Sequence, residues 1–591
     1  MAGTATVTRP ARVAAARTRR ERRSRQHERW LARWRSPWCE ALLLGALFAV
    51  AAIARWPYLL RLPHFTDEIG EIHWALQIAH GDAFPLTSQV SYMGPYQHYL
   101  LAAALKLFGP HVLLPRLLVL LIGALTVVLT YLVGKELAGR EVGLLAGLLL
   151  ATLPQHIVVN SHVAWQNSTT PVYTTLACWA LLRALRAATT APPRAATGWW
   201  ALAGLAYGVA VGTHLGVVVL APALLGVVVV ALWRGRAWAV LRRPGPYLAA
   251  LAALVAYSPL LIANLRNGLA GYYRMKGRDY AFVAHPTGAT YQHNLVNLLL
   301  ELARMISNPF RLPERYLHYL TSPYLPLMAL LCLLGLVLLV RRGQYLPAFA
   351  LVSTAAIMPY FNHAYGVEGD RYLVTGRYVA FLLPLLEIAI AAAALAIARW
   401  FLAVIPHRWQ GLALRDAATV LPAALLIALV LYPIVPLRRY YTHEASLDPD
   451  NASFLATIAF IKANSGPRTP VLVDFNMSKI NLRDGADGRE IVDVLLTLAN
   501  VPHTTSNDPA GDLTRLGTAV DPNDTEALPI IVMMRDQCWP LRDTVPLQRI
   551  SGRYRLRELY WTLQSYYGVY RYAPSPQPAG CLPASGPTPG D

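Results

Sequence analysis

Residues 38–71 read WCEALLLGALFAVAAIARWPYLLRLPHFTDEIGE, an apolar run followed by a short acidic segment. The run from Trp38 to Trp56 is long enough to cross the hydrocarbon core of a bilayer as a helix. Soon after it, Phe65-Thr66-Asp67-Glu68-Ile69-Gly70-Glu71 places three carboxylates within five positions. Acidic side chains next to the hydrocarbon core are energetically unfavourable, so their presence there indicates a function. This stretch therefore predicts a membrane protein and the place of its chemistry.

The composition of the whole chain agrees with a membrane protein. Of its 591 residues 55% are hydrophobic and 15% are charged, whereas a soluble protein carries about 25% charged residues. The net charge of +20 would point to nucleic acid in a soluble protein. Here the excess lies in short connectors between apolar runs, where it sets topology. Without a nucleic-acid-binding motif, we expect no nucleic-acid partner.

Apolar runs long enough to cross about 30 Å predict about eleven transmembrane helices. The run 199–233 is too long for one span, and we divide it at Gly212-Thr213-His214-Leu215-Gly216. The predicted spans are 38–56, 112–134, 141–159, 167–187, 199–214, 215–233, 246–264, 322–340, 345–362, 376–398 and 417–436.

Basic residues give these spans a direction. Residues 1–37 are Arg-rich without a signal-peptide core, and they predict a disordered cytoplasmic tail. Every connector that this count places in the cytoplasm is basic, as the positive-inside rule requires: Lys135, Arg140, Arg183, Arg186, Arg194, Arg234, Arg236, Arg242, Arg243, Arg341, Arg342, Arg399, Arg408 and Arg415. We therefore expect a multi-pass plasma-membrane protein that ends outside.

The outer segments carry their own structure. The pattern of 68–79 and the stretch 96–108 predict helices lying in the membrane interface. Residues 437–573 mix one helical pattern with buried strands at 470–475 and 528–534, and they predict a small extracytoplasmic α/β domain beside the membrane domain 38–436. Residues 574–591 read as a disordered tail. Cys538 and Cys581 either pair outside the cytoplasm or stay free thiols.

A single carboxylate facing a membrane suits one kind of group transfer. Hydrolysis of an ordinary glycosidic bond needs a second carboxyl group to protonate the leaving alcohol. A sugar on a lipid phosphate needs none, because phosphate leaves as an anion, and one base for the attacking hydroxyl is then enough. The phosphate charge is best stabilised by Arg, and this chain has Arg residues at the outer ends of its spans.

These residues occur in an order that resembles a known family. Asp67-Glu68 is followed by Ala75-Leu76, Gly81-Asp82, Gly94-Pro95, Leu107-Phe108-Gly109, Pro115-Arg116-Leu117 and, much later, Gly376-Arg377-Tyr378. The series over residues 38–400 resembles the GT-C glycosyltransferases of the protein O-mannosyltransferase and lipid A aminoarabinose transferase type. It departs from them at Met93-Gly94-Pro95, where relatives have His-Pro-Pro, and at Asn167, where many have Asp. Trp-Trp-Asp, the oligosaccharyltransferase motif, is absent from the sequence.

The resemblance implies transfer of a sugar from a polyprenyl-phosphate donor to a glycan, lipid or protein at the outer face, with inversion. It assigns the base to Asp67, with Glu68 in support, and leaves a divalent metal at Asp67 open. For the donor phosphate we name Arg377, Tyr378, Arg371 and Arg116. For the acceptor or sugar we name Asn167, Trp165, Glu71 and His214.

Each assignment has a structural alternative. Asp67 would also serve as a helix N-cap, Arg377 as an interfacial anchor, and His214 as a loop histidine. For the whole chain, the alternatives are a transporter or lipid flippase and a non-catalytic receptor. Transporters carry ionisable residues at the bilayer midplane in repeated halves; in this sequence the acidic residues lie in loops and no repeat is visible.

Overall fold

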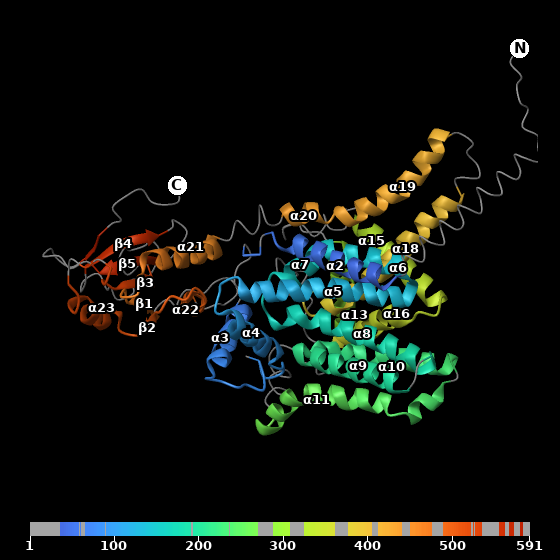
Figure 1. The fold of residues 1–591 in the computed structure, drawn as a ribbon, viewed down its shortest axis with the longest axis horizontal. Helices are drawn as coiled ribbons and strands as arrows, with labels where there is room; N and C mark the ends of the chain where they lie inside the picture. Colours follow the sequence, from blue (N-terminus) through green and yellow to red (C-terminus); the bar gives the residue numbers. More distant parts are fainter. Residues whose placement is uncertain are drawn as a thin grey trace, which may run out of the picture.

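The protein combines a bundle of long helices with a mixed sheet near its C-terminal end (Figure 1). The structure is a computed structural model. It describes residues 36–57, 59–60, 66–88, 90–190, 193–235, 237–269, 288–307, 324–360, 376–404, 412–439, 449–475, 488–521, 524, 526–534, 555–561, 567–572 and 580–582. The expected N-terminal tail up to residue 35, Arg371 and Cys538 lie outside these ranges, as do the side chains of Asp67 and Cys581. The expected disordered C-terminal tail 574–591 also lies outside them except for residues 580–582, which form a strand.

Helices cover each of the eleven predicted apolar runs, as far as these are described. The helices before residue 440 are α2 (Pro37–Arg55), α3 (Thr66–His80), α4 (Tyr96–Phe108), α5 (Leu114–Ala138), α6 (Arg140–Thr152), α7 (Pro154–Ser161), α8 (Gln166–Thr190), α9 (Pro193–Thr213), η1 (Leu215–Leu220), α10 (Ala221–Arg234), η2 (Trp238–Arg242), α11 (Gly245–Arg266), α13 (Gly288–Ser307), α15 (Tyr324–Arg341), α16 (Leu346–Ile357), η4 (Met358–Tyr360), η5 (Ala380–Leu382), α18 (Leu383–Val404), α19 (Leu412–Leu431) and α20 (Ile434–Arg439).

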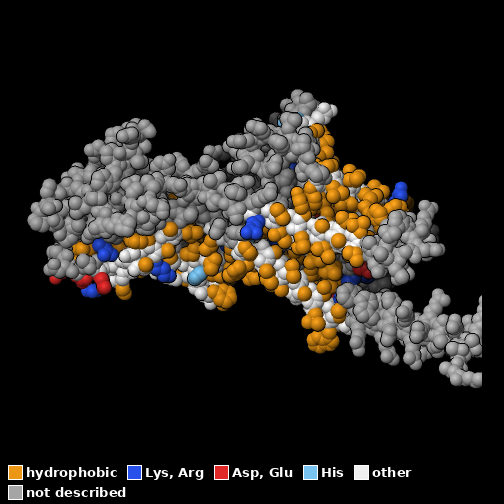
Figure 2. Space-filling view, turned by 90° about the horizontal axis from the view of Figure 1, so that it is seen from above, with side chains coloured by type: hydrophobic (Ala, Val, Ile, Leu, Met, Phe, Trp, Pro, Cys, Tyr) orange, Lys and Arg blue, Asp and Glu red, His pale blue; other side chains and the backbone are white. Residues whose placement is uncertain are grey.

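Six helices in the described ranges are long and apolar enough to cross a membrane, or seven if the bent pair α6 and α7 forms one span. The predicted division of 199–233 is found, because α9 ends at Thr213 and η1 begins at Leu215. The exact number of eleven crossings stays a prediction. Figure 2 shows a face of the bundle on which apolar side chains dominate the described surface, as contact with lipid requires.

The break between α6 and α7 has a local cause. Pro154 opens α7 and has no N–H to continue the helix, so the two helices meet at 65°. The carbonyls released near the break face Arg55, whose guanidinium donates to the oxygens of Ala151 at 3.0 Å and Leu150 at 3.3 Å. Arg55 is fully buried. The cost of burying Arg55 is offset because its guanidinium hydrogen-bonds to carbonyl groups that would otherwise be unpaired in the interior.

Helices α3 and α4 pack against the C-terminal elements. Ile69, Ile72 and Leu76 of α3 are at most 6% exposed. They share a core with Leu101 of α4, with Phe454 and with residues of the sheet and its helices. The apolar face of α3 is therefore covered by protein, because an amphipathic pattern specifies that a face is buried, not whether protein or lipid covers it. That α3 and α4 lie in the membrane interface stays a prediction. Leu107 and Phe108 at the end of α4 are exposed.

The C-terminal elements form a six-stranded sheet of order β2-β1-β3-β5-β4-β6. Strands β1 (Val471–Asp474), β2 (Thr504–Ser506) and β3 (Ile530–Met534) are parallel, and helices α22 (Gly488–Leu498) and α23 (Pro509–Thr518) connect them. β5 (Tyr567–Tyr572) continues antiparallel beside β3 and beside β4 (Arg555–Trp561), and β6 (Gly580–Leu582) completes the edge. Helix α21 (Pro449–Asn464) precedes β1, and α22 lies between the sheet and α3.

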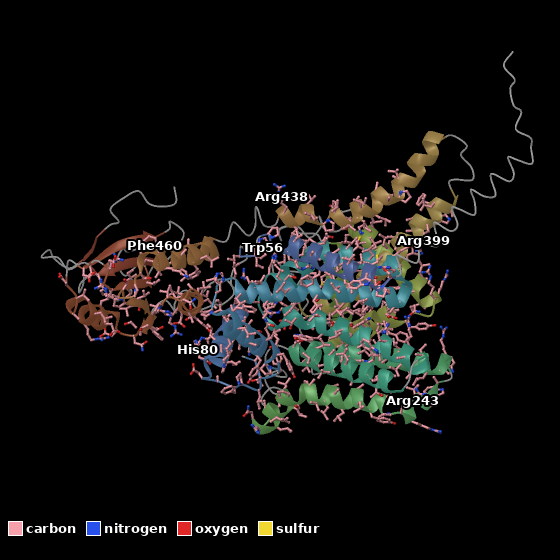
Figure 3. The ribbon with its side chains drawn as sticks, in the orientation of Figure 1. Trp56, His80, Arg243, Arg399, Arg438 and Phe460 are labelled. Carbon is pink, nitrogen blue, oxygen red and sulfur yellow. The ribbon has the colours of Figure 1, made fainter. Side chains whose placement is uncertain are left out.

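The two ends of the bundle differ. Arg243 and Arg399, both from predicted cytoplasmic connectors, lie at the end far from the sheet (Figure 3). Trp56 and His80 lie at the other end, on the side of Phe460 and the C-terminal elements. The predicted inner connectors and the predicted outer segments are thus separated along the bundle; which end faces the cytoplasm stays a prediction.

Candidate active site

The loop between α7 and α8 is held by two carboxylates of α3. Glu68 Oε1 accepts the backbone N–H of Ala164 at 2.9 Å, and Glu71 Oε1 accepts that of Gln166 at 2.9 Å. The two side chains share a helix face because they are three residues apart, and both are buried. The first N–H groups of a helix have no partner within the helix and favour negative charge. The acidic segment of the sequence therefore positions the start of α8.

Glu68 is also one half of a buried ion pair. Arg116, at the start of α5, donates through Nε to Glu68 Oε1 at 2.8 Å and through Nη2 to Glu68 Oε2 at 2.7 Å. Arg116 Nη1 donates to the carbonyl of Leu59 at 3.0 Å. The structure thus brings together two predicted site residues, one assigned to catalysis and one to the donor phosphate. Their roles toward a substrate stay predictions, and the geometry shows Arg116 oriented on Glu68.

Glu71 has a histidine beside it. His98 Nε2 of α4 lies 3.7 Å from Glu71 Oε2, beyond hydrogen-bond distance. Burial lowers the pKa of His98 to about 4, so the imidazole is neutral at pH 7. Glu71 therefore has no cationic partner in His98 at this pH, and its Oε1 accepts from the Gln166 N–H at the start of α8.

On its other side the loop packs on the Arg377 segment. The Arg377 guanidinium lies over the Trp165 ring, with Cζ 4.3 Å from the ring centroid, and Nη2 donates to the Tyr378 hydroxyl at 3.1 Å. The Tyr378 ring is 4.9 Å from that of His214. Trp165 is fixed from behind, because Nε1 donates to the carbonyl of Val159 at 3.1 Å. These four residues, from three places far apart in the sequence, form one cluster.

Asn167 and Gln166 extend this cluster into α8. Gln166 Nε2 donates to the carbonyls of Gly212 and Thr213 at the end of α9, which lies next to His214. Asn167 is buried, and no hydrogen-bond partner for its Oδ1 is found in the described ranges. A buried polar atom of this kind marks a place where a ligand or water completes the hydrogen bonding.

Glu301 of α13 is a site candidate that the sequence analysis missed. It is 1% exposed, and neither carboxyl oxygen has a hydrogen-bond partner among the residues described. It lies against Gly376: a Cβ added there would be 3.2 Å from Glu301 Oε1 and 2.5 Å from Gln155 Nε2, so glycine allows this close approach. Burial raises the pKa of Glu301 to about 8, and Arg304 partly opposes the effect. The available signal was one acidic residue within the apolar run 298–303.

Two predicted site residues, Asp67 and Arg371, lie partly or wholly outside the described residues. Asp67 lies in α3 directly before Glu68, but its side chain is outside the described set, and so is all of Arg371. No group of three or more His, Cys, Asp or Glu side chains that could hold a metal is found where the chain is described. A divalent metal at Asp67 thus stays an open alternative.

Comparisons with known proteins define the class. Residues 93–262 match the family described as "Dolichyl-phosphate-mannose-protein mannosyltransferase". ArnT from Cupriavidus metallidurans bound to undecaprenyl phosphate is similar at a TM-score of 0.50 and 16% identity, covering 89% of this chain and 97% of that one. The Archaeoglobus fulgidus oligosaccharyltransferase has a TM-score of 0.46 at 12% identity, covering 92% of this chain and 75% of that one. A comparison with curated proteins finds no match.

Residues 93–262 thus resemble the mannosyltransferase family, and the chain as a whole shares the fold of ArnT. Both findings support the resemblance to GT-C glycosyltransferases of the O-mannosyltransferase and ArnT type that was drawn from the sequence.

The buried pair makes a prediction about stability. Glu68→Gln leaves Arg116 buried without its counter-charge, and we expect it to lower the free energy of unfolding by about 3 kcal/mol, measured by thermal unfolding of the purified protein. Glu68→Leu combined with Arg116→Met should recover most of that loss. The control is Glu141→Gln, whose partner Arg399 is exposed, with an expected loss below about 1 kcal/mol. Equal losses at the two sites would contradict the arrangement.

Glu301 makes a prediction about pH. Its folded-state pKa is raised, so its contribution to stability is complete below the unfolded value and is lost as pH rises through the folded value near 8. We expect the melting temperature of the wild type to fall relative to Glu301→Gln between about pH 5 and pH 8, whereas the exposed-site variant Glu526→Gln should follow the wild type. Parallel curves for the wild type and Glu301→Gln would show that the carboxyl group is already ionised when folded.

Proposed function

We propose that this enzyme transfers one sugar from a polyprenyl-phosphate donor to a hydroxyl group of a glycan, lipid or protein at the extracytoplasmic face of the membrane. The configuration at the anomeric carbon is inverted in this transfer. The observation that carries the proposal is the cluster of Trp165, Arg377, Tyr378 and His214. It lies against the same short loop that Glu68 and Glu71 anchor. A guanidinium and an acidic helix end thus meet at one end of the bundle.

Asp67 is the proposed base. The acceptor oxygen attacks the anomeric carbon, and its proton passes to the Asp67 carboxylate. The bond between that carbon and the phosphate oxygen breaks, and polyprenyl phosphate leaves as an anion. No general acid is required, because the leaving group is already stable when charged. The hydrogen bonds of Glu68 fix α3 one residue away and so support a defined position for Asp67.

Arg377 and Tyr378 are the proposed phosphate ligands. Stacking on Trp165 orients the planar guanidinium, and an oriented guanidinium binds phosphate oxygens through paired hydrogen bonds. We assign Arg371 to the same group. For Arg116 we propose an indirect part in which it fixes Glu68, since its donors already bind that carboxylate and Leu59.

The proposed sugar and acceptor contacts are Trp165, Asn167, Glu71 and His214, and we add Glu301. The unpartnered oxygens of Asn167 and Glu301 supply acceptors for hydroxyl groups in a dry setting. A carboxyl group with a pKa near 8 is protonated at pH 7 and also donates a hydrogen bond. Such a set suits a polyhydroxylated ligand.

The assignment of Asp67 is tested by Asp67→Asn. Because the amide cannot accept the proton, we expect sugar transfer to fall by at least about a hundredfold, measured with radiolabelled polyprenyl-phosphate mannose and related donors on reconstituted protein. Asp82→Asn, in the exposed turn after α3, should retain wild-type transfer. Near-normal transfer by Asp67→Asn would rule out this base. Lipid translocation by a wild type that transfers no sugar would favour the flippase alternative.

The assignment of Arg377 is tested by Arg377→Lys, which keeps the charge but loses the stacked, two-pronged geometry. We expect binding of undecaprenyl phosphate to weaken about tenfold, measured by thermophoresis of the purified protein. Arg266→Lys, an exposed change at the end of α11, is the matched control. Unchanged affinity in Arg377→Lys would place the phosphate elsewhere.

A further inference from the structure

A pocket lies at the end of the bundle opposite the candidate active site. Its volume is about 210 Å³, and it is formed where α5, α8 and α10 end and where α15 turns into α16. Glu136 on its wall is about twenty residues beyond Arg116 in α5, or about 30 Å at the rise of an α-helix. That length matches the hydrocarbon core of a bilayer. The pocket is therefore one membrane thickness from the candidate active site, in the opposite interface.

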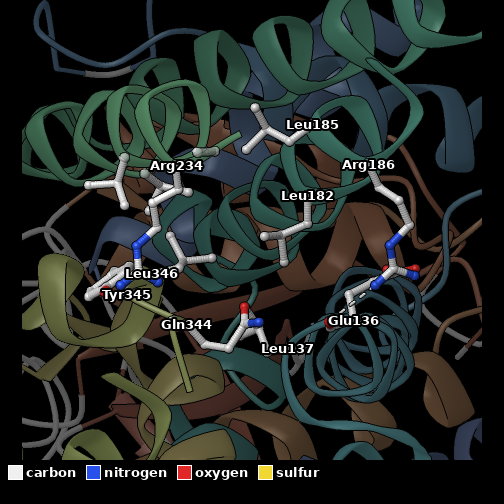
Figure 4. A pocket seen from close by; sticks show the side chains of 13 residues that line it. Glu136, Leu137, Leu182, Leu185, Arg186, Arg234, Gln344, Tyr345 and Leu346 are labelled. Carbon is white, nitrogen blue, oxygen red and sulfur yellow. Dashed lines mark hydrogen bonds and ion pairs between the residues drawn. The ribbon is translucent and has the colours of Figure 1, made fainter. Parts of the chain in front are cut away.

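Charged side chains occupy two sides of this pocket (Figure 4). Arg234 lies over Tyr345, with Cζ 5.0 Å from the ring centroid. Arg183 and Arg186 both pair with the buried Glu136 on the other side. Gln344 projects between the two sides. This region thus holds three guanidinium groups and one carboxylate, and that carboxylate pairs with Arg183 and Arg186. In the described part of the chain, no carboxylate lies within ion-pair distance of Arg234.

The turn below Arg234 is shaped to admit the guanidinium. Gly343 has φ of +79°, and a Cβ added there would be 2.6 Å from Arg234 Nη1. A positive φ favours glycine, so the turn conformation depends on this residue. Gly343 also places the backbone of the turn close to the Arg234 guanidinium.

The other walls are apolar. Leu182, Leu185, Val227 and Val230 line the pocket. The adjacent face of α10 exposes Val229 and Trp233, and Trp238 is exposed in η2. Exposed tryptophans are typical of the depth at which headgroups begin. A cationic recess with apolar walls at that depth fits a ligand with an anionic head and hydrocarbon chains.

We propose that this pocket binds the phosphodiester headgroup of an anionic phospholipid, with Arg234 as the phosphate ligand and Gln344 as a hydrogen-bond donor. The acyl chains then lie along the apolar surface of α8 and α10. Glu136 weakens this binding, because its carboxylate repels the phosphate and engages Arg183 and Arg186.

The test measures lipid retention on the full-length protein. Wild type in phosphatidylcholine nanodiscs is exchanged with phosphatidylglycerol, and bound lipid is counted by native mass spectrometry after release into detergent. We expect phosphatidylglycerol to be retained over phosphatidylcholine and Arg234→Gln to bind it about fivefold more weakly. Arg234→Lys keeps the charge but loses the stacking on Tyr345, so its binding should lie between those of the wild type and Arg234→Gln. Arg342→Gln, an exposed change in the same connector, is the matched control.

A gain of binding separates the proposal from damage to the fold. Glu136→Gln should raise retention of phosphatidylglycerol about fivefold, since it removes the repelling charge. Three results would overturn the proposal: equal retention of the two lipids, an equal effect of Arg234→Gln and Arg342→Gln, or displacement by millimolar inorganic phosphate, which would indicate a site for free anions.

Discussion

The ion pair between Glu68 and Arg116 is the interaction on which the end of the bundle with the candidate active site depends. Two charges buried together are costly, and they are tolerated only when each is fully hydrogen-bonded. Glu68 meets that condition by accepting from Arg116 and from the backbone of Ala164, and Arg116 also donates to Leu59. One carboxylate thus links α3, α5, the segment after α2 and the loop before α8. The rest of the site lies on the far side of that loop.

This arrangement divides the charged residues by task. The side chains of Glu68 and Arg116 hydrogen-bond to each other, so they fix the positions of α3 and α5. Arg377 lies over the ring of Trp165 and within cation–π distance of that of Tyr378. Arg234, at the other end of the bundle, lies over the ring of Tyr345 in the same way. In both places an aromatic face orients a guanidinium, and these are the two places for which we propose anion binding.

Much of this was predictable from the sequence, for physical reasons. Membrane helices are specified by apolar length, so the runs appear as helices, and even the division before Leu215 was found. The order of short motifs indicated the superfamily. The pairing of Glu68 with Arg116 was not predictable, because hydrophobic periodicity does not indicate which distant residue pairs with a buried charge. For the same reason the pattern of α3 predicted a buried face but not the C-terminal residues that cover it. Glu301 was missed because one carboxylate in an apolar run resembles a boundary residue until its burial is seen.

The shared core of α3, α4 and the C-terminal helices constrains how such enzymes diversify. Ile69 and Ile72 belong to the helix that carries the acidic segment, yet their neighbours include Phe454 and residues of the sheet. A C-terminal domain exchanged between relatives would have to bring matching surfaces for both helices. Exchange of the C-terminal elements between relatives is therefore restricted to those that preserve this shared core, so that α3, α4 and the sheet evolve together.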